Sequence, residues 1–509
     1  MTDTIVTHIE YHAAQAATAV ALIADKGALT YAALNRAANR VAHHLLAHRP
    51  SAARPAVRTE PGLVAICMAP TPERIVAMLG VLKAGLAYVP VVTDVSDSAL
   101  RDMLAHLQPR IILGDAAHCA RLSGMGFDTV DAGAIPPGGR DDNPGLRQAP
   151  EDIAFIRYTS GSTGVPKGVV HSHRAALGLA RICAEGMSLR AGDCISFLTS
   201  FPHATILGCL GAGAALQILD VKREGLRQMA ARLSADNVTV LEIFPSMLRR
   251  LAIALRSGGR LPALRCVALN GEGVTRPDVM LARQFMAEDG IVLNQYGSSE
   301  CCQITAWPMA GEPPEGEPIP IGAPVAGIAL RLIDPEGKVV PPGEPGEITV
   351  VSPFMTSGYW RRPDLTRAVF GRTVPDGPID TYRTGDIGRV DGTGRLTVIG
   401  RVDNQIKLRG FRITPEEIEG VLRLHPAVTN AVVRPFPDDR GETQLAAFVL
   451  PAAGTNPDGS ALRAFLRDKV PDACVPVAIL MRDDLPMSAS GKMDRQALPD
   501  PLPLWRGLG

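Results

Sequence analysis

The amino-acid sequence predicts an α/β protein with a large N-terminal domain of layered α/β subdomains plus a β-rich subdomain, and a small α+β C-terminal domain. Three observations lead to this prediction. Apolar, β-rich runs alternate with Ala- and Leu-rich runs over roughly the first 300 residues, which is typical of α/β layers. From about Ala329 the chain changes to short β-rich runs. From about residue 404 a helical run is combined with further strands.

The layered part is predicted element by element. A strand, a helix and a second strand are expected at Leu63–Met68, Pro72–Lys83 and Ala87–Val91. The apolar stretch Ala204–Leu219 has 16 residues, which is short for a membrane span, so we expect a buried helix there. The other predicted strands are Ile111–Gly114 and, after a Pro/Gly-rich loop at 134–150, Ile153–Tyr158, Cys194–Thr199, Thr239–Phe244, Arg265–Leu269 and Ile291–Gln295.

Two further groups of elements follow. The β-rich subdomain is predicted from the runs ALRLID, EITVV, LTVIG and IKLRG. The C-terminal domain is predicted from a helix at Pro415–Leu424 and strands at Val428–Arg434, Leu445–Leu450 and Ala478–Met481. This mixture of one helix and several short strands indicates an α+β unit.

Composition excludes several classes of function. The 52 Lys and Arg residues balance 52 Asp and Glu residues, which argues against nucleic-acid binding. With 3 Trp, 7 Tyr and 12 Phe in 509 residues, a platform for stacking bases is not expected. The nine Cys include no C-x-x-C pair, and the N-terminus has no basic and apolar leader. We therefore expect free thiols, a cytoplasmic location and no membrane partner.

The clearest chemical motif is a loop of small and hydroxyl-bearing residues that follows a predicted strand. It reads YTSGSTGVPKG, from Tyr158 to Gly168, and it ends in Lys167. Main-chain N–H groups and hydroxyls of such a loop can surround phosphate oxygens, while the lysine supplies a positive charge. Pro166 and Gly168 flank the lysine, so the loop is not that of a P-loop kinase or ATPase.

Five other segments, together with this loop, resemble the motifs of the adenylate-forming superfamily in the order that the family shows. This superfamily comprises acyl- and aryl-CoA synthetases, adenylation domains of nonribosomal peptide synthetases, and luciferase. The matching segments are Asn270-Gly271-Glu272, Asn294-Gln295-Tyr296-Gly297-Ser298-Ser299-Glu300, Tyr382-Arg383-Thr384-Gly385-Asp386, Gly400–Gly410 and Ser490-Gly491-Lys492-Met493-Asp494-Arg495. The chain thus looks like a freestanding peptide-synthetase-like adenylation enzyme or an acyl- or aryl-CoA synthetase.

The resemblance implies that ATP and Mg²⁺ are used to activate a carboxylic acid as an acyl adenylate, with release of pyrophosphate. Lys492 would reach the carboxylate and the α-phosphate, Thr163 would assist, and Glu300 would hold Mg²⁺. Tyr296 would stack on adenine, Asp386 would bind the ribose hydroxyls, and Arg401 would reach ribose or phosphate. The full set of implied ATP contacts is Thr159, Ser160, Gly161, Ser162, Thr163, Gly164, Lys167, Gly271, Glu272, Asn294, Tyr296, Gly297, Ser299, Asp386, Arg401 and Lys492.

The resemblance also implies a moving C-terminal domain. Residues 1–403 would form the adenylation core and residues 404–509 a lid, with Asp403 as the hinge. In one orientation Lys492 would face the site. In the other, Lys407 and Gly410 would open a tunnel for a phosphopantetheine thiol.

The acid-binding pocket departs from the amino-acid-activating pattern. Peptide-synthetase domains carry F-D-x-S, whereas this chain reads Phe201-Pro202-His203-Ala204, closer to the P-x-H region of acyl- and aryl-CoA ligases. This argues against an α-amino acid. His171 and His173 are interpreted as helix-start residues rather than metal ligands. The expected pocket residues are His203, Asn270, Gly271, Gly297, Cys301, Cys302 and Gln303, with His203 also among the catalytic groups.

The hinge and lysine motifs resemble those of peptide synthetases more than those of CoA ligases. We therefore expect transfer of the acyl group to a carrier-protein phosphopantetheine, which would act in trans because about 14 residues follow Arg495. Two alternatives in the same class use CoA or a free amine as the acceptor. A non-catalytic nucleotide-binding relative is the alternative of another class, and the presence of Lys492, Glu300 and Asp386 disfavours it.

Overall fold

The computed structural model of the chain describes most of its 509 residues. These are residues 3–25, 27–47, 62–91, 93, 96–159, 167–199, 202–220, 223–255, 259–309, 311–313, 319–374, 377–402, 406–408, 411–413, 415–437, 443–467, 469–470, 475–487, 493–495 and 497–506.

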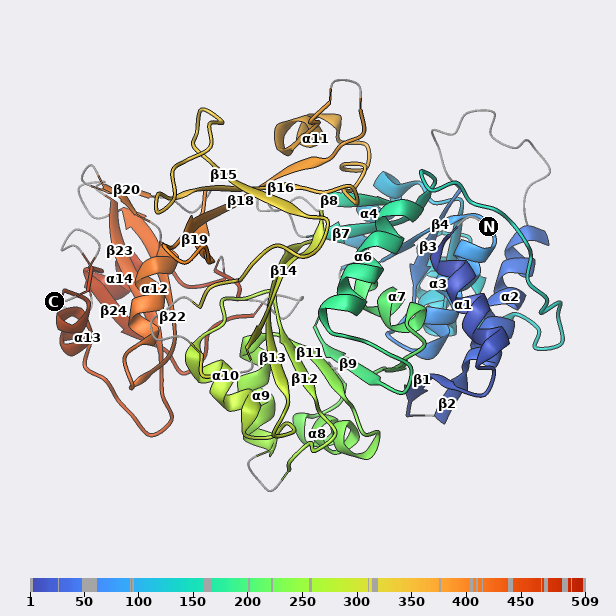
Figure 1. Cartoon of the computed structure of the whole chain (residues 1–509), viewed down its shortest axis with the longest axis horizontal. Helices are drawn as coiled ribbons and strands as arrows, with labels where there is room; N and C mark the ends of the chain where they lie inside the picture. Colours follow the sequence, from blue (N-terminus) through green and yellow to red (C-terminus); the bar gives the residue numbers. More distant parts are fainter. Residues whose placement is uncertain are drawn as a thin grey trace.

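Two largely parallel sheets form the framework of the N-terminal part (Figure 1). The six-stranded sheet has the order β6-β5-β3-β4-β7-β8, with only β8 antiparallel to its neighbour. Its strands are β3 (Leu63–Cys67), β4 (Ala87–Pro90), β5 (Ile111–Gly114), β6 (Val130–Asp131), β7 (Ile153–Thr159) and β8 (Lys167–Ser172). Strands β3 and β4 are apolar and buried throughout, as expected of parallel strands covered on both faces.

The second sheet has eight strands in the order β14-β13-β12-β11-β9-β10-β1-β2. Both edge strands, β14 and β2, run antiparallel to the parallel strands between them. The bounds are β1 (Val20–Ala24), β2 (Gly27–Thr30), β9 (Cys194–Leu198), β10 (Ala215–Gln217), β11 (Val240–Ile243), β12 (Cys266–Leu269), β13 (Ile291–Ser298) and β14 (Cys302–Met309).

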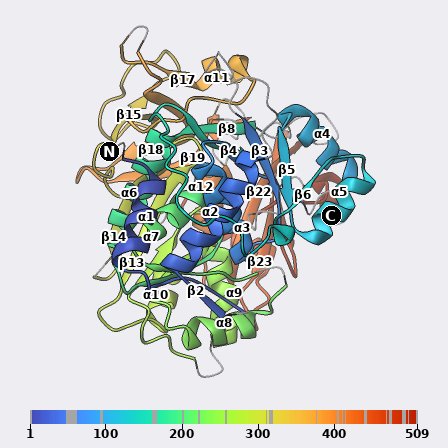
Figure 2. The ribbon, with the colours of Figure 1, turned by 90° about the vertical axis from the view of Figure 1, so that its right-hand side faces the viewer.

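Helices and sheets alternate in five layers. The middle helix layer shares one apolar core with both sheets and contains α1 (Ile5–Gln15), α2 (Tyr31–Ala47), α3 (Pro72–Lys83), α6 (His173–Gly186) and α7 (His203–Gly211). Figure 2 shows α1, α2 and α3 at the end of the molecule that carries the N-terminus. The outer layers are α4 (Asp97–Leu107) and α5 (Ala116–Gly124) on the first sheet, and α8 (Leu226–Ala235), α9 (Pro245–Leu255) and α10 (Arg276–Arg283) on the second.

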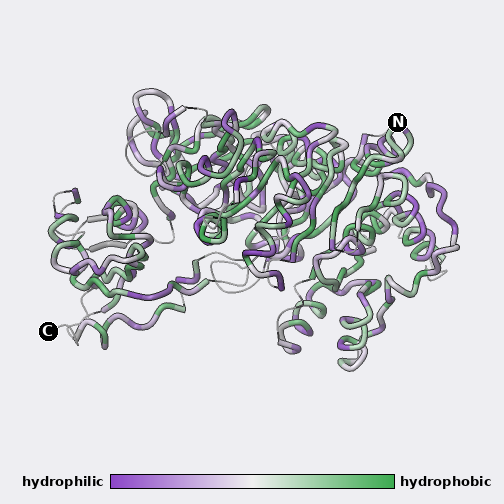
Figure 3. The backbone as a smooth tube through the Cα atoms, turned by 90° about the horizontal axis from the view of Figure 1, so that it is seen from below, coloured by the Kyte–Doolittle hydropathy of each residue, from purple (hydrophilic) through white to green (hydrophobic). Residues whose placement is uncertain are grey.

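A β-rich subdomain and a small α+β lobe complete the chain. The subdomain contains β15 (Ala329–Ile333), β16 (Gly346–Val351), α11 (Pro363–Val369), β17 (Phe370–Gly371), β18 (Thr381–Val390) and β19 (Leu396–Arg401). The lobe contains β20 (Ile406–Leu408), β21 (Phe411–Ile413), α12 (Pro415–Arg423), β22 (Val428–Pro437), β23 (Thr443–Pro451), α13 (Gly459–Arg467), β24 (Ala478–Met481) and α14 (Pro501–Arg506). Figure 3 shows this lobe to one side of the larger body. The predicted fold class is confirmed.

Two local predictions are wrong. The stretch Ala204–Leu219 is not one helix, because α7 ends at Gly211 and the chain returns as strand β10. The turn depends on Gly213, which has φ +76° and packs against His12, where a Cβ would meet the imidazole at 2.8 Å. His171 lies on strand β8 rather than at a helix start, whereas His173 is the first residue of α6.

None of the helices in the described ranges combines the length and the low charge that crossing a bilayer requires.

Candidate active site

The predicted site residues gather where the parallel strands of the second sheet end. Asn270 follows the last residue of β12, and Glu300 lies in the turn between β13 and β14. His203 is the first residue of α7, after β9. Loops at the carboxyl ends of parallel strands are the usual ligand-binding edge of such sheets. Strands β18 and β19 of the β-rich subdomain supply two more of the predicted residues, Asp386 and Arg401.

Three predicted nucleotide-binding residues from two sheets meet directly. The Tyr296 hydroxyl, on β13, donates to Asp386 Oδ2 at 2.5 Å. The Arg401 guanidinium donates to Asp386 Oδ1 at 2.7 Å, and these two residues are register partners on β18 and β19. Burial, and then the negative charge of Asp386, raises the pKa of Tyr296, so the phenol stays protonated as a donor. Both oxygens of Asp386 are thus oriented by neighbouring donors.

Glu300 is held by a residue that the sequence did not single out. The Tyr359 hydroxyl donates to Glu300 Oε1 at 2.8 Å, and burial and the Glu300 charge raise the pKa of Tyr359. Lys167 Nζ, at the end of the predicted phosphate loop, lies 5.5 Å from the centre of the Tyr359 ring. Tyr359 therefore links the predicted metal-binding carboxylate with the predicted phosphate-binding lysine.

Two predicted ATP contacts use their side chains to hold the fold. Glu272 accepts hydrogen bonds from the main-chain N–H and the hydroxyl of Ser246, at 2.9 and 2.8 Å, at the start of α9. Asn294 Nδ2 donates to the carbonyl oxygen of Pro320 at 2.9 Å. Gly271, before Glu272, has φ +75°, a conformation that favours glycine. These residues shape the loop edge, and their contact with a nucleotide remains a prediction.

His203 lies inside a stack of aromatic rings. Its ring centroid is 5.0 Å from that of Phe155, and its Nδ1 is 3.1 Å from the Tyr88 hydroxyl. Phe155 in turn stacks on His171, with ring centroids 4.6 Å apart. Burial lowers the pKa of His203 well below its usual value, and burial together with the positive charge of Arg157 lowers that of His171 to about 3. Both imidazoles are neutral at physiological pH.

This neutrality predicts an acid-labile fold. At low pH the two histidines bind a proton in the unfolded chain and not in the folded chain. The fold therefore loses stability as the pH falls below the pKa that these histidines have in the unfolded chain. Between about pH 7.5 and 5.5, His171 should account for about 1.4 kcal/mol of lost unfolding free energy. Urea unfolding of the parent and of His171→Asn at both pH values measures how much of the loss in unfolding free energy is due to His171. An equal loss in the two proteins would show that folding does not lower the pKa of His171.

The structure also places the predicted pocket residues. Asn270 Nδ2 donates to Glu242 Oε1 on β11 at 2.7 Å, and Gln303 Oε1 accepts from Gln295 Nε2 at 3.4 Å. Cys301 is fully buried in the core that joins the β-rich subdomain to α6, with its Sγ 3.3 Å from Ser298 Oγ. Gly297 is exposed. Glu242 was missed in the sequence, although a carboxylate within the apolar run TVLEIF is a usable signal.

Several predicted residues lie outside the part of the chain that the structure describes. These are the phosphate-loop residues Ser160, Gly161, Ser162, Thr163 and Gly164, the hinge residue Asp403, the tunnel residue Gly410 and the lysine Lys492. For Thr159, Cys302 and Lys407 only the main chain is described.

The chain on either side of Lys492 is anchored to the C-terminal lobe. Met493 forms a β-bridge with Met487. Arg495 donates from both terminal nitrogens to the carboxylate of Glu419 on α12, at 2.6 and 2.7 Å. Glu419 also accepts from the main-chain N–H of Val433 on β22 at 2.7 Å. The residues that follow Lys492 are therefore fixed to two elements of this lobe.

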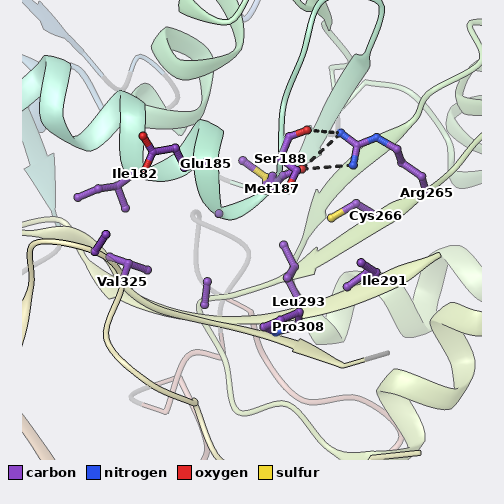
Figure 4. Close-up of a pocket in the computed structure, with 13 residues that line it drawn as sticks. Ile182, Glu185, Met187, Ser188, Arg265, Cys266, Ile291, Leu293, Pro308 and Val325 are labelled. Atoms are coloured by element: carbon purple, nitrogen blue, oxygen red, sulfur yellow. Dashed lines mark hydrogen bonds between the residues drawn. The ribbon is translucent and has the colours of Figure 1, made fainter. Parts of the chain in front are cut away.

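A separate groove of about 470 Å³ lies between the C-terminal end of α6 and strands β12–β14 (Figure 4). Arg265 at its rim donates to the carbonyl oxygen of Ser188 at 2.8 Å. Glu185, Cys266 and Leu293 also line it. The groove lies at the amino-terminal ends of β12 and β13, opposite the edge that carries Asn270, and none of the predicted site residues lines it.

The sequence matches two protein-family models and is similar to several known peptide synthetases. The model of the AMP-binding enzyme family matches residues 9–360, and that of the AMP-binding enzyme C-terminal domain matches residues 417–492. The chain is 33% identical to tyrocidine synthase 3 of Brevibacillus parabrevis in an alignment of 509 residues that covers 97% of this chain and 8% of that protein. It is 35% identical to the phosphinothricin tripeptide synthetase PhsC of Streptomyces viridochromogenes in an alignment of 493 residues that covers 93% of this chain and 43% of that protein.

A solved structure shares the whole fold. Klebsiella oxytoca NpsA, in complex with 3-hydroxyanthranilyl-AMSN, superposes with a TM-score of 0.82 at 23% identity, and the match covers 100% of both chains. The chain spans less than half of the length of each of the two curated relatives, whereas it matches NpsA from end to end.

Proposed function

Because the chain belongs to the AMP-binding enzyme family and is an adenylate-forming ligase that binds ATP, we propose that it activates a small carboxylic acid and transfers it to a carrier protein. In the first step the acid's carboxylate attacks the α-phosphorus of ATP, which gives acyl-AMP and releases pyrophosphate. In the second step the phosphopantetheine thiol of the carrier protein, acting in trans, attacks the acyl carbon and releases AMP.

The observation that carries this proposal is the convergence of Tyr296, Asp386 and Arg401 beside the pair formed by Glu300 and Tyr359. Asp386 offers a carboxylate, already oriented, to the two ribose hydroxyls, and Arg401 offers a positive charge next to it. Carboxylate and triphosphate repel each other, so the reaction needs cations where the two meet. Lys167 and Lys492 are the lysines that we assign to this task.

Glu300 suits a magnesium ion that arrives with the nucleotide. Mg²⁺ is usually held by one or two carboxylates together with substrate phosphates rather than by an all-protein cage. In the described part of the chain, no group of three or more His, Cys, Asp or Glu side chains is arranged as a metal site. Glu300, with one oxygen engaged by Tyr359, would therefore share the ion with the phosphates, and the ion would neutralise their charge.

Separate cores support the proposed division into residues 1–403 and 404–509. The apolar clusters of the lobe contain only residues from Ile418 onward, and those of the larger body end at Val398. Helix α12 of the lobe contacts β19 of the β-rich subdomain. Two bodies with their own cores can rotate about a short connection, which we assign to Asp403, so that Lys492 or the Lys407–Gly410 side faces the site.

A more rigid connection should slow the transfer step more than the adenylation step. In Asp403→Pro the fixed φ of proline restricts the rotation, so we expect thioester formation to fall by more than tenfold while adenylation keeps most of its rate. Acid-dependent ATP–pyrophosphate exchange measures the first step and loading of a holo carrier protein measures the second. Asp364→Pro, in the first turn of α11 in the β-rich subdomain, is the matched control. Equal losses in both assays would contradict the hinge.

The similarity to peptide synthetases favours a carrier protein as the acceptor of the acyl group, while CoA and a free amine are the alternatives in the same class. We place the reaction in the cytoplasm, where ATP is available and where the buried thiols of the seven cysteines whose side chains are described would stay reduced. Pyrophosphate exchange screened over aryl, aliphatic, β-amino and α-amino acids tests the activity. Exchange with none of them would favour a non-catalytic nucleotide-binding relative.

A further inference from the structure

A carboxylate is buried next to the predicted acid pocket. Glu242 lies on β11 and is 4% exposed. Its neighbours Leu241 and Ile243 face the core beneath α8–α10, whereas Val240 faces the core that contains α7. Because side chains alternate along a strand, Glu242 points to the α7 side, one residue from the carboxyl end of β11. It is therefore at the same edge of the sheet as Asn270.

The hydrogen bonds of Glu242 are incomplete. Asn270 donates to Oε1, and a hydrogen bond from Thr205 in the first turn of α7 also favours the charged form. Oε2 is buried and accepts no hydrogen bond from any described residue. Burial raises the pKa of Glu242, and the positive charge of Arg157 opposes this rise without reaching the carboxyl as an ion pair within the described chain. A buried carboxylate oxygen with no donor is costly unless a ligand supplies one.

Two amides continue this polar surface along the sheet. Gln295 on β13 is 7% exposed and donates to Gln303 Oε1 on β14. Gln303 is 6% exposed, and its Nε2 has no hydrogen-bond partner among the described residues. It packs against Gly186 of α6, where a Cβ would lie 2.5 Å from Nε2. The two buried atoms without a partner, Glu242 Oε2 on β11 and Gln303 Nε2 on β14, are separated in the sheet by β12 and β13, which carry Asn270 at the end of β12 and Gln295. This row of polar groups indicates a binding site for a polar ligand.

We propose that the acid activated by this enzyme carries an amino group away from its carboxyl, and that Glu242 binds this amino group through Oε2, with Asn270 beside it and the amides of Gln295 and Gln303 further along the same edge of the sheet. This inference rests on the proposed function, because it assumes that the pocket receives the acid. An amino N–H supplies the donor that Oε2 lacks, and its positive charge compensates that of the carboxylate. Pro202 stands where the amino-acid-activating pattern has its aspartate, so the carboxylate that would bind an α-amino group is missing there, and Glu242 supplies a carboxylate from β11 instead.

The test compares pairs of acids that differ in one amino group. Butyrate is paired with 4-aminobutyrate and benzoate with 3-aminobenzoate, and L-alanine represents the α-amino acids. We expect kcat/KM for pyrophosphate exchange to be at least about tenfold higher for one of the two amino members than for its parent acid and for L-alanine. Glu242→Gln should lower kcat/KM for that amino acid roughly 10- to 100-fold and leave KM for ATP unchanged.

The matched control is Glu185→Gln, an exposed carboxylate at the rim of the groove beside α6. This variant should keep the acid preference of the parent. If the acid preference changed in Glu185→Gln and not in Glu242→Gln, the acid would bind in that groove and the proposal would be overturned. If Glu242→Gln does not fold, Gln303→Met removes the second partnerless group while conserving volume, and it should reduce the same preference. An unchanged preference in this variant would equally overturn the inference.

The wild-type enzyme distinguishes failure of this inference from failure of the proposed function. Exchange that favours butyrate or benzoate over its amino partner would overturn the inference and leave the ligase activity intact. Absence of exchange with every acid, combined with absence of ATP binding by calorimetry, would instead overturn the proposed function.

Discussion

Replacement of Lys492 by alanine is expected to lower acid-dependent ATP–pyrophosphate exchange by roughly two to three orders of magnitude. The lysine is assigned to the charge that develops between the incoming carboxylate and the α-phosphorus, and loss of one preorganised donor at such a point costs about 10²- to 10³-fold in kcat. The second half-reaction should be spared, because the proposed rotation removes Lys492 from the site. Transfer from a synthetic acyl-AMP to the carrier protein should therefore keep most of its rate.

Lys469→Ala is the control for this experiment. Lys469 lies in the same lobe, is exposed and lies 5.0 Å from the centre of the Phe465 ring. It should not change exchange, and both variants should keep the circular dichroism and the melting temperature of the parent. Near-normal exchange in Lys492→Ala, or equal losses in exchange and transfer, would refute the assigned role.

The variant Asp386→Asn is expected to weaken ATP binding by roughly 10- to 100-fold, because hydrogen bonds to a charged group contribute about 1.5–3 kcal/mol. The substitution removes the charge that Tyr296 and Arg401 orient and that we assign to the ribose. Calorimetric titration with ATP measures the dissociation constant, and the exchange assay gives KM for ATP. KM for the carboxylic acid should change little, since the pocket around His203 and Asn270 is on other elements.

An exposed aspartate–arginine pair supplies the control. Asp364 accepts from Arg362 at 3.0 and 2.8 Å at the start of α11, and Asp364→Asn should leave ATP binding unchanged. The comparison separates the loss of a nucleotide contact from the general loss of one surface ion pair, which contributes little. Unchanged ATP binding in Asp386→Asn would remove Asp386 from the nucleotide site.

The sequence predicts regular elements best where the local pattern and the final packing agree. Ile111–Gly114, Ala478–Met481 and the helix Pro72–Lys83 have the bounds that their patterns predict, because short apolar runs and a proline at the helix start mark their ends. The prediction of one helix over Ala204–Leu219 was wrong because the composition of this stretch suits a single buried helix as well as a helix followed by a buried strand. The contact between Gly213 and His12, far apart in sequence, decides between them.

The sequence motifs predict which positions could form the site, and they do not predict the contacts between those positions. The motif order brings Tyr296, Glu300, Asp386 and Arg401 to one edge, and the structure places these residues there. The pairing of Tyr359 with Glu300 joins residues 59 apart, and a tyrosine after a glycine carries no mark of that role. Glu242 stands out in the sequence as a carboxylate within an apolar run, but its contacts with Asn270 and its burial depend on how α7 packs on the sheet.

The clamp between Arg495 and Glu419 has a mechanical consequence for catalysis. Only two residues, Met493 and Asp494, separate Lys492 from this clamp, a span of at most about 10 Å of extended chain. In the proposed rotation Lys492 would therefore move together with the lobe, and the orientation of the lobe would determine whether the lysine can reach the phosphorus. Rotations of whole domains occur in microseconds to milliseconds, so a carrier protein that bound one orientation of the lobe would also control the timing of the chemistry.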